Sequence, residues 1–196
     1  MLESARLRLR MANRADVPEI IRFYRENAQH LSPFEPERSE EFYTELYWEA
    51  QVDRHRQDFE DDRALRMWLF RRDDDRTIQG NVHLSNFIRG VKQSCTLGYA
   101  LAATAQGHGY MTEILRVAIG YAFGDLAFHR IEANYMPHNV RSGQVLKRLG
   151  FRIEGYAYDY LCIGGQWRDH LLTSLTAQCD PLFQAPGSPF PTPHHP

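Results

Sequence analysis

The chain has few cysteines and no long apolar run. Its three cysteines, Cys95, Cys162 and Cys179, match neither a disulfide framework nor a zinc pattern. None of its nine histidines lies in an H-E-x-x-H arrangement, so no metal site is expected. No segment approaches the roughly 18 uninterrupted apolar residues of a membrane span, and the first residues lack the apolar core of a signal peptide. These absences favour a protein of the reducing cytoplasm with no membrane partner.

A strong charge of either sign is also missing. Lys and Arg number 23 against 25 Asp and Glu, for a net charge of −2. Sequence-blind nucleic-acid binding needs a basic excess, so we expect no strong direct contact with nucleic acid. The 196 residues, 43% hydrophobic and 24% charged, have the composition of one globular domain. We expect that domain to span residues 1–180, because the proline-rich residues 181–196 predict a disordered tail.

Hydrophobic periodicity predicts a mixed α/β layer architecture around one sheet. A helix is expected after Asn13 or Asp16, either of which can cap it, with Ile20, Ile21 and Tyr24 in the core. Two prolines predict a loop over 30–36. The other expected elements are strands over 6–11, 66–70, 77–87, 95–102, 130–135, 153–162 and 170–176, and helices over 39–61, 110–123 and 139–149.

The most informative segment is the turn Gln106–Met111, which reads Q-G-H-G-Y-M. It lies between an apolar strand-like run and a helix pattern marked by Met111, Ile114 and Leu115. A glycine turn at a helix start presents backbone N–H groups and the positive end of the helix dipole to an anion. No Lys-Ser/Thr pair follows, which excludes the nucleotide-hydrolysing P-loop. The turn therefore indicates a phosphate or pyrophosphate site, with a tight connection that binds nothing as the alternative.

A second dense segment spans residues 135–142. Asn139 is placed to cap a helix, and Ser142 follows in the first turn. Capping alone would explain both residues. However, this helix and the one after the glycine turn each begin after a strand. Both starts could therefore lie at the same edge of the sheet and hold one extended ligand.

These features resemble the Gcn5-related N-acetyltransferase (GNAT) superfamily, whose acetyl-CoA loop reads Gln/Arg-x-x-Gly-x-Gly/Ala. Gln106 and Gly109 fit that pattern, and Met111 departs from it. Over residues 5–177 the chain is similar to the RimJ branch, the N-terminal alanine acetyltransferases of ribosomal proteins. The segments that carry this are L-S-P-F-E-P-E-R (31–38), H-R-I-E-A-N-Y-M-P-H-N (129–139), R-S-G (141–143), R-L-G-F (148–151) and G-Q-W-R-D-H (165–170). The resemblance implies a GNAT fold: a mixed, mostly antiparallel, splayed sheet of about seven strands flanked by helices.

The resemblance implies acetyl transfer from acetyl-CoA to an N-terminal alanine of a ribosomal protein, such as one on the assembling small subunit. The amine would attack directly in a ternary complex, without a metal. The enzyme would be a cytoplasmic monomer or homodimer. Residues implied to bind the cosubstrate are Tyr99, Ala100 and Leu101 through their backbone, Gln106, Gly107, His108, Gly109, Tyr110, Met111 and Thr112 at the pyrophosphate, and Asn139 and Ser142 at the pantetheine arm and thiol.

Two residues are candidates for catalysis. Strand alternation places Glu132 opposite Ile131 and Ala133, so its carboxylate could accept the proton of the amine. The alternative is a surface or ion-paired glutamate. Many superfamily members carry a tyrosine acid seven residues after the asparagine, but this chain has Leu146 there. Ser142 is therefore the candidate that bonds the departing thiolate.

Two other functions remain open. The first is acetylation of a small amine such as an aminoglycoside or polyamine, favoured by an acidic cluster that a solvated helix face would also explain: Glu35, Glu37, Glu40 and Glu41. The second is a non-catalytic acetyl-CoA-binding or ribosome-assembly protein, for which Leu146 and Met111 are mild support. Acceptor recognition is expected from residues 31–38, Tyr47, Trp48 and the turn around Trp167.

Overall fold

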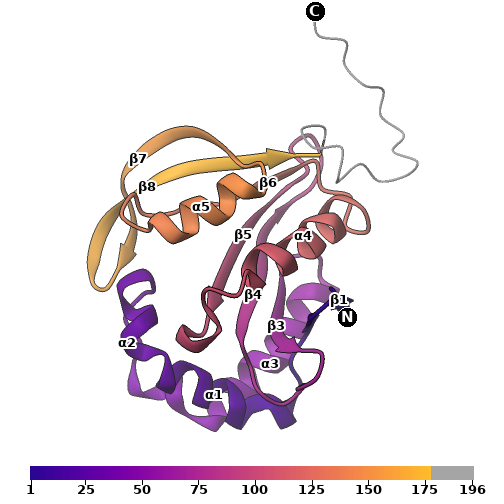
Figure 1. Cartoon of the computed structure of the whole chain (residues 1–196), viewed down its shortest axis with the longest axis vertical. Helices are drawn as coiled ribbons and strands as arrows, with labels where there is room; N and C mark the ends of the chain where they lie inside the picture. The colour runs from indigo at the N-terminus through magenta and orange to yellow at the C-terminus, as the bar shows by residue number, and fades with distance from the viewer. Residues whose placement is uncertain (178–196) are drawn as a thin grey trace, which may run out of the picture.

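Eight strands form one sheet in the computed structural model, which describes residues 1–177 (Figure 1). Their order across the sheet is β1-β2-β3-β4-β5-β6-β8-β7. The strands are β1 (Leu2–Glu3), β2 (Leu7–Arg10), β3 (Leu65–Arg71), β4 (Gly80–Ile88), β5 (Ser94–Leu101), β6 (Arg130–Glu132), β7 (Arg152–Ile163) and β8 (Gln166–Thr176). Only β5 and β6 pair in parallel within this sheet. The expected mixed, mostly antiparallel α/β fold is confirmed.

The sheet opens between β5 and β6. Their pairing covers only Ser94–Thr96 against Arg130–Glu132. Beyond that point β5 continues toward α2, while β7 and β8 diverge from β5, as Figure 1 shows. The unpaired half of β5 therefore presents one edge to a gap.

Five helices cover the two faces of the sheet: α1 (Val17–Glu26), α2 (Ala28–Leu31), α3 (Glu45–Glu60), α4 (Tyr110–Phe123) and α5 (Val140–Arg148). On one face, α4 and α5 pack on Leu69, Val82 and Leu97. On the other, α1 and α3 pack on Trp68 and Phe70. The predicted apolar positions of α1 and α4 are buried because their spacing places them on one side of a helix.

The segment before α3 differs from the prediction of one helix over 39–61. Glu40–Tyr43 form a 3₁₀ turn, and α3 begins after Thr44, whose hydroxyl accepts the Tyr47 N–H at 3.3 Å. In α3, Trp48 and Val52 are buried and Leu46 is 80% exposed. The Trp48 indole donates to the Phe42 carbonyl at 2.8 Å. Trp48 is thus a core residue.

Three other details of the secondary structure differ from the prediction. The expected loop 30–36 holds the end of α2 and a 3₁₀ turn, Ser32–Phe34, because a proline is compatible with a first helical turn. The strand expected over 130–135 ends at Glu132, apart from a bridge between Tyr135 and Leu171. The two-residue strand β1 is too short to leave a periodic signal. The predicted tail, residues 181–196, lies outside the described residues.

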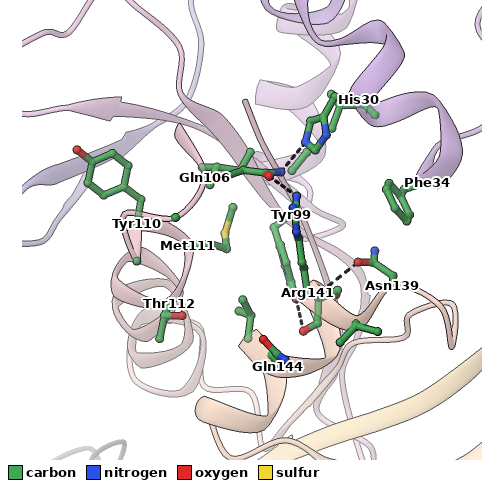
Figure 2. A pocket seen from close by; sticks show the side chains of 18 of the residues that line it. His30, Phe34, Tyr99, Gln106, Tyr110, Met111, Thr112, Asn139, Arg141 and Gln144 are labelled. Carbon is green, nitrogen blue, oxygen red and sulfur yellow. Dashed lines mark hydrogen bonds between the residues drawn. The ribbon is translucent and has the colours of Figure 1, made fainter. Parts of the chain in front are cut away.

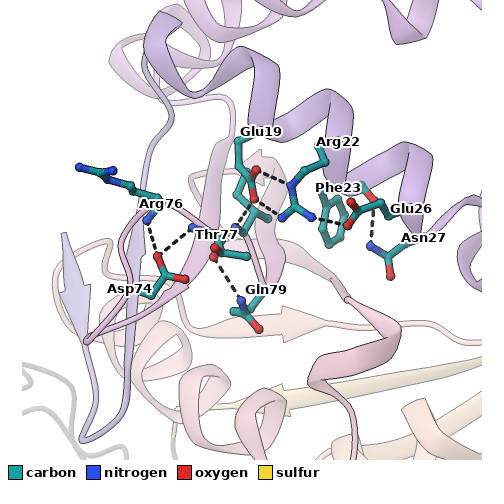
Figure 3. A network of polar contacts seen from close by, with 10 residues as sticks. Glu19, Arg22, Phe23, Glu26, Asn27, Asp74, Arg76, Thr77 and Gln79 are labelled. Carbon is teal, nitrogen blue, oxygen red and sulfur yellow. Dashed lines mark hydrogen bonds and ion pairs between the residues drawn. The ribbon is translucent and has the colours of Figure 1, made fainter.

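Polar contacts tie α1 to the β3–β4 connection (Figure 3). The Glu19 carboxylate accepts the Ile78 N–H at 2.7 Å and is held by Arg22. At the end of α1, the buried Asn27 side chain donates to the Phe23 carbonyl and accepts the Ala103 N–H, both at 2.8 Å. Asn27 thereby fixes the 3₁₀ turn Ala103–Ala105 that leads into the glycine turn.

Candidate active site

A cleft of about 940 Å³ lies at the gap beside β5 (Figure 2). Three groups of residues form its walls: the edge of β5 and the glycine turn, the start of α5, and the end of α2 with the turn that follows. They include Tyr99, Ala100, Leu101, Gln106, Gly107, Gly109, Tyr110, Met111, Thr112, His138, Asn139, Ser142, His30, Phe34 and Glu35. Nearly every residue expected at the cosubstrate therefore lies on one cavity.

The glycine turn has the conformation that its sequence predicts. Gly107 and Gly109 have φ of +81° and +76°, a left-handed region that disfavours other residues. A Cβ on Gly107 would meet nothing within 4 Å, so the turn is open on that side. Gly109 is the N-cap of α4, so the amides of Tyr110 and Thr112 begin the helix without helical partners. Tyr110 and Thr112 both line the cleft, and the role of their amides as an anion site stays a prediction.

His108 lies outside the cleft, although the sequence placed it with the cosubstrate. Its side chain is exposed, and its carbonyl accepts a hydrogen bond from Arg6 at 3.0 Å. Arg6 also donates to the Glu113 carboxylate at 2.7 Å. That ion pair neutralises an acidic side chain in the first turn of α4, so the helix start keeps its preference for an anion.

Met111 replaces the small residue of the GNAT loop pattern. It is 6% exposed and packs into the core beneath the sheet with Ile114 and Leu115. A long side chain is accommodated because it points into the core. Figure 2 shows Met111 at the base of the cleft.

The edge of β5 offers peptide groups to the gap. The Ala102 N–H donates to the Gln79 carbonyl at 2.8 Å, on the β4 side. Peptide groups alternate between the two edges of an extended strand, so those of Ala100 also face β4. The N–H and C=O groups of Tyr99 and Leu101 therefore face the cleft, whereas those of Ala100 do not.

Tyr99 and Ser142 meet across the cleft. The Tyr99 hydroxyl lies 2.8 Å from Ser142 Oγ, and the Asn139 side chain accepts the Ser142 N–H at 3.2 Å. Burial raises the pKa of Tyr99 to about 12, so the hydroxyl stays protonated at neutral pH. The sequence indicated only the Tyr99 backbone, because strand periodicity does not reveal which distant residue a side chain meets.

Leu146, which stands in the place of the usual tyrosine, is 2% exposed and belongs to the core. It leaves no polar group at that position of α5. The tyrosine hydroxyl next to Ser142 comes from β5 instead.

Glu132 is positioned away from the cleft wall. Its Oε1 lies 3.0 Å from the Arg130 guanidinium and 3.1 Å from the Lys92 ammonium. Burial alone would raise the pKa of Glu132, but hydrogen bonds from Arg130 and Lys92 outweigh it and leave the pKa lowered. The base role of Glu132 stays a prediction, and these contacts match the ion-paired alternative.

The turn after α2 separates the main cleft from a second one of about 520 Å³, and Leu31 and Glu35 line both. Glu35 is the only carboxylate among the described residues of the main cleft. Its carbonyl accepts the N–H of Gly164, at the tip of the β7–β8 hairpin, at 3.2 Å. The hairpin therefore reaches the expected acceptor segment through its glycine tip, whereas Trp167 is 65% exposed.

Sequence reasoning assigned no role to several residues of the cleft: His30, His138, Arg141, Gln144, Val145 and Arg148. Their spacing in the sequence does not show that they share a cavity, because His30 comes from α2, His138 precedes the Asn139 cap, and the other four lie on α5. Phe34 and His138 stack at 6.1 Å across the mouth. Within residues 1–177, no group of three or more His, Cys, Asp or Glu side chains could hold a metal ion. No helix of that part is long and apolar enough to cross a membrane.

Comparison with known proteins decides the family. Residues 6–152 match the model of the acetyltransferase (GNAT) domain. The chain belongs to the GNAT acetyltransferase family. It is 43% identical over 175 residues to the [ribosomal protein uS5]-alanine N-acetyltransferase of Escherichia coli, covering 89% of this chain and 90% of the relative. The expected N-acetyltransferase class is confirmed.

Two solved GNAT structures are similar throughout. A ribosomal-protein-S5-alanine acetyltransferase from Vibrio fischeri is 33% identical, with a TM-score of 0.85, and the match covers 90% of this chain and 96% of that one. Mycobacterium smegmatis RimJ in complex with CoA-disulfide is 29% identical, with a TM-score of 0.83, covering 91% of this chain and 88% of that one. The GNAT enzyme studied here therefore shares its whole described fold with the RimJ type.

Proposed function

We propose that the protein transfers the acetyl group of acetyl-CoA to the α-amino group of an N-terminal alanine on a ribosomal protein, with uS5 as the first candidate. One observation carries this proposal: a single cleft joins the α4 anion site, the free edge of β5 and the acceptor-side turn. The similarity to a uS5-alanine N-acetyltransferase over nine-tenths of the chain supports the acceptor. Such an acceptor would place the reaction in the cytoplasm.

The residues present fit acetyl-CoA. The amides of Tyr110 and Thr112 would hold the diphosphate, and Arg141 and Arg148 line the same cleft with positive charge. The free peptide groups of Tyr99 and Leu101 would bond the pantetheine amides. When bound, acetyl-CoA supplies an acetyl group activated as a thioester.

This arrangement supports direct attack by the amine. The described residues of the cleft include no cysteine, and Ser142 bonds Tyr99 and not a histidine. No activated nucleophile of the paired type is therefore present there. An N–H of β5, on Tyr99 or Leu101, is free to stabilise the oxyanion. Ser142, with Tyr99 behind it, would donate a hydrogen bond to the sulfur as the C–S bond breaks.

The acceptor would enter over the turn that follows α2. Phe34 and Leu31 would supply apolar surface for an alanine methyl group. The Glu35 carboxylate, which also accepts a hydrogen bond from Arg38 at 3.0 Å, would bind the ammonium. The residues after the alanine would extend into the second cleft, beneath the hairpin tip at Gly164. Glu35 thus competes with Glu132 for the role of base.

The test is thiol release from acetyl-CoA with an Ala-initiated peptide, the same peptide with a blocked amino group, and a panel of polyamines and aminoglycosides. We expect release only with the free Ala peptide. Glu35→Gln should lower kcat/KM at least tenfold, and Glu132→Gln should lower it less than threefold if its ion pairs are structural. Thiol release with polyamines alone would identify a small amine, and not a protein, as the acceptor. Binding of acetyl-CoA without thiol release in the presence of any amine would indicate a non-catalytic protein.

A further inference from the structure

The side chain of Gln106 spans the cleft. Its Nε2 lies 2.7 Å from Nε2 of His30 on α2, and its Oε1 accepts a hydrogen bond from Nη1 of Arg141 on α5. Figure 2 shows Gln106 between His30 and Arg141, with a dashed line to each. Gln106 therefore joins the acceptor-side helix to the helix of the cosubstrate side.

Arg141 fixes the direction of this bridge. A guanidinium only donates hydrogen bonds, so the Gln106 oxygen must face Arg141 and the amide N–H must face His30. His30 Nε2 must then accept, which requires an unprotonated Nε2 and, in the neutral ring, a proton on Nδ1. In a fully protonated imidazole Nε2 carries a proton, so the His30 N–H and the Gln106 N–H would both be donors and the hydrogen bond between them would be lost.

We infer that Gln106 is a positioning residue that couples the acceptor-binding turn to the cosubstrate-binding helix, and that it does so only while His30 is neutral. His30 immediately precedes Leu31 and lies one turn before Phe34 and Glu35. The bridge holds these acceptor residues at a fixed distance from α5. This role rests on the acceptor proposed above.

Other titratable and charged groups lie near His30 in the sequence or on the same cleft. They are Glu26 one turn before it on α1, Glu35 after it, Tyr99 on β5, Tyr110 on α4, and His138, Arg141 and Arg148 at α5. Of these, only Arg141 bonds the Gln106 side chain within the described residues. In Gln106→Glu, a carboxylate accepts from both Arg141 and a protonated His30, so acid no longer breaks the bridge.

The experiment measures KM for an Ala-initiated peptide at about pH 6 and about pH 8, on either side of the range in which histidine ordinarily titrates. The variants are Gln106→Glu and, as a matched control, Gln29→Glu, which adds the same charge on the exposed side of α2. The peptide amine titrates in the same way in assays of every enzyme, so its effect cancels in the ratio of two KM values at one pH. Loss of one neutral hydrogen bond corresponds to an increase of about fivefold in KM.

We expect KM of the wild type divided by KM of Gln106→Glu to rise about fivefold from pH 8 to pH 6. The KM of Gln29→Glu should change with pH as the wild-type KM does. An unchanged ratio would overturn the coupling. Imidazole ¹⁵N NMR gives a second readout that needs no acceptor: the wild type should show His30 protonated on Nδ1 and Gln106→Ala a mixture of tautomers. A wild-type proton on Nε2 would overturn the bridge even if peptide turnover failed and the proposed function with it.

Discussion

At the scale of single residues, the hydroxyl next to Ser142 shows how the fold replaces a missing group. Leu146 removes the usual tyrosine from α5, and Tyr99 supplies a hydroxyl from β5 at 2.8 Å from Ser142 Oγ. Because burial raises the pKa of Tyr99 to about 12, its hydroxyl keeps its proton at neutral pH, and either hydroxyl of the pair can donate to the other. The proposed role of the pair is to stabilise negative charge on a leaving sulfur.

This pair predicts a non-additive effect. Ser142→Ala and Tyr99→Phe should each lower kcat about tenfold, equal to about 1.4 kcal/mol of barrier. The double variant should lose little more than either single one, because both substitutions remove the same hydrogen-bonded donor. Steady-state kinetics with saturating acetyl-CoA checks this. Normal turnover by Ser142→Ala would remove it from the mechanism.

At the scale of elements, the glycine turn depends on backbone conformation more than on space. A Cβ on Gly109 would lie 3.8 Å from Arg6, an ordinary contact, but its φ of +76° disfavours alanine. Gly109→Ala should therefore lose about 1 kcal/mol of unfolding free energy and weaken acetyl-CoA binding through the moved amides. Urea denaturation and isothermal calorimetry measure the two effects.

Gly120, in the interior of the same helix, is the matched control. A Cβ there would meet nothing within 4 Å, so Gly120→Ala should stabilise the protein by about 0.5–1 kcal/mol and leave acetyl-CoA affinity unchanged. Equal loss of affinity in both variants would show that the turn conformation is not what holds the cosubstrate.

Helices and strands were predictable where neighbouring residues in the sequence determine them. The helix after Gly109 and the Asn139 cap followed from periodicity and capping rules. The helix expected over 39–61 was wrong at its start, because the Thr44 cap was not recognised and the bury-or-expose choice between Trp48 and Leu46 depends on tertiary packing. The segments 31–38 and the turn around Trp167 were expected on the acceptor side, but nothing in the sequence indicated the contact between Gly164 and Glu35, because it forms only through the folded sheet.

At the scale of the whole molecule, buried histidines make folding sensitive to mild acid. Burial, together with the positive charge of Arg66, lowers the pKa of His83 to about 3. An unfolded chain binds this proton below the ordinary histidine pKa of about 6.5 and the folded chain does not. Stability is therefore present above about pH 6.5 and is lost as pH falls from there toward the folded value.

His83→Gln tests this linkage. Between pH 6.5 and pH 5 the wild type should lose up to about 2 kcal/mol more unfolding free energy than the variant, from 1.36 kcal/mol per pH unit. Urea denaturation at several pH values measures the slope. His55, whose pKa burial lowers to about 4, remains in the variant and leaves a residual slope. Identical slopes would mean that His83 takes up a proton in the folded protein as readily as in the unfolded chain, and would contradict the lowered pKa.

The central claim is that one cleft brings acetyl-CoA and the α-amino group of an N-terminal alanine together. The most direct test incubates unmodified ribosomal protein uS5 with the enzyme and acetyl-CoA, then locates the added acetyl group by tandem mass spectrometry of the digested product. We expect acetylation of the α-amino group of the first residue, with the lysines unmodified and with slower modification by the Glu35→Gln enzyme. Acetylation of lysine side chains, or of a polyamine in preference to the protein, would contradict it.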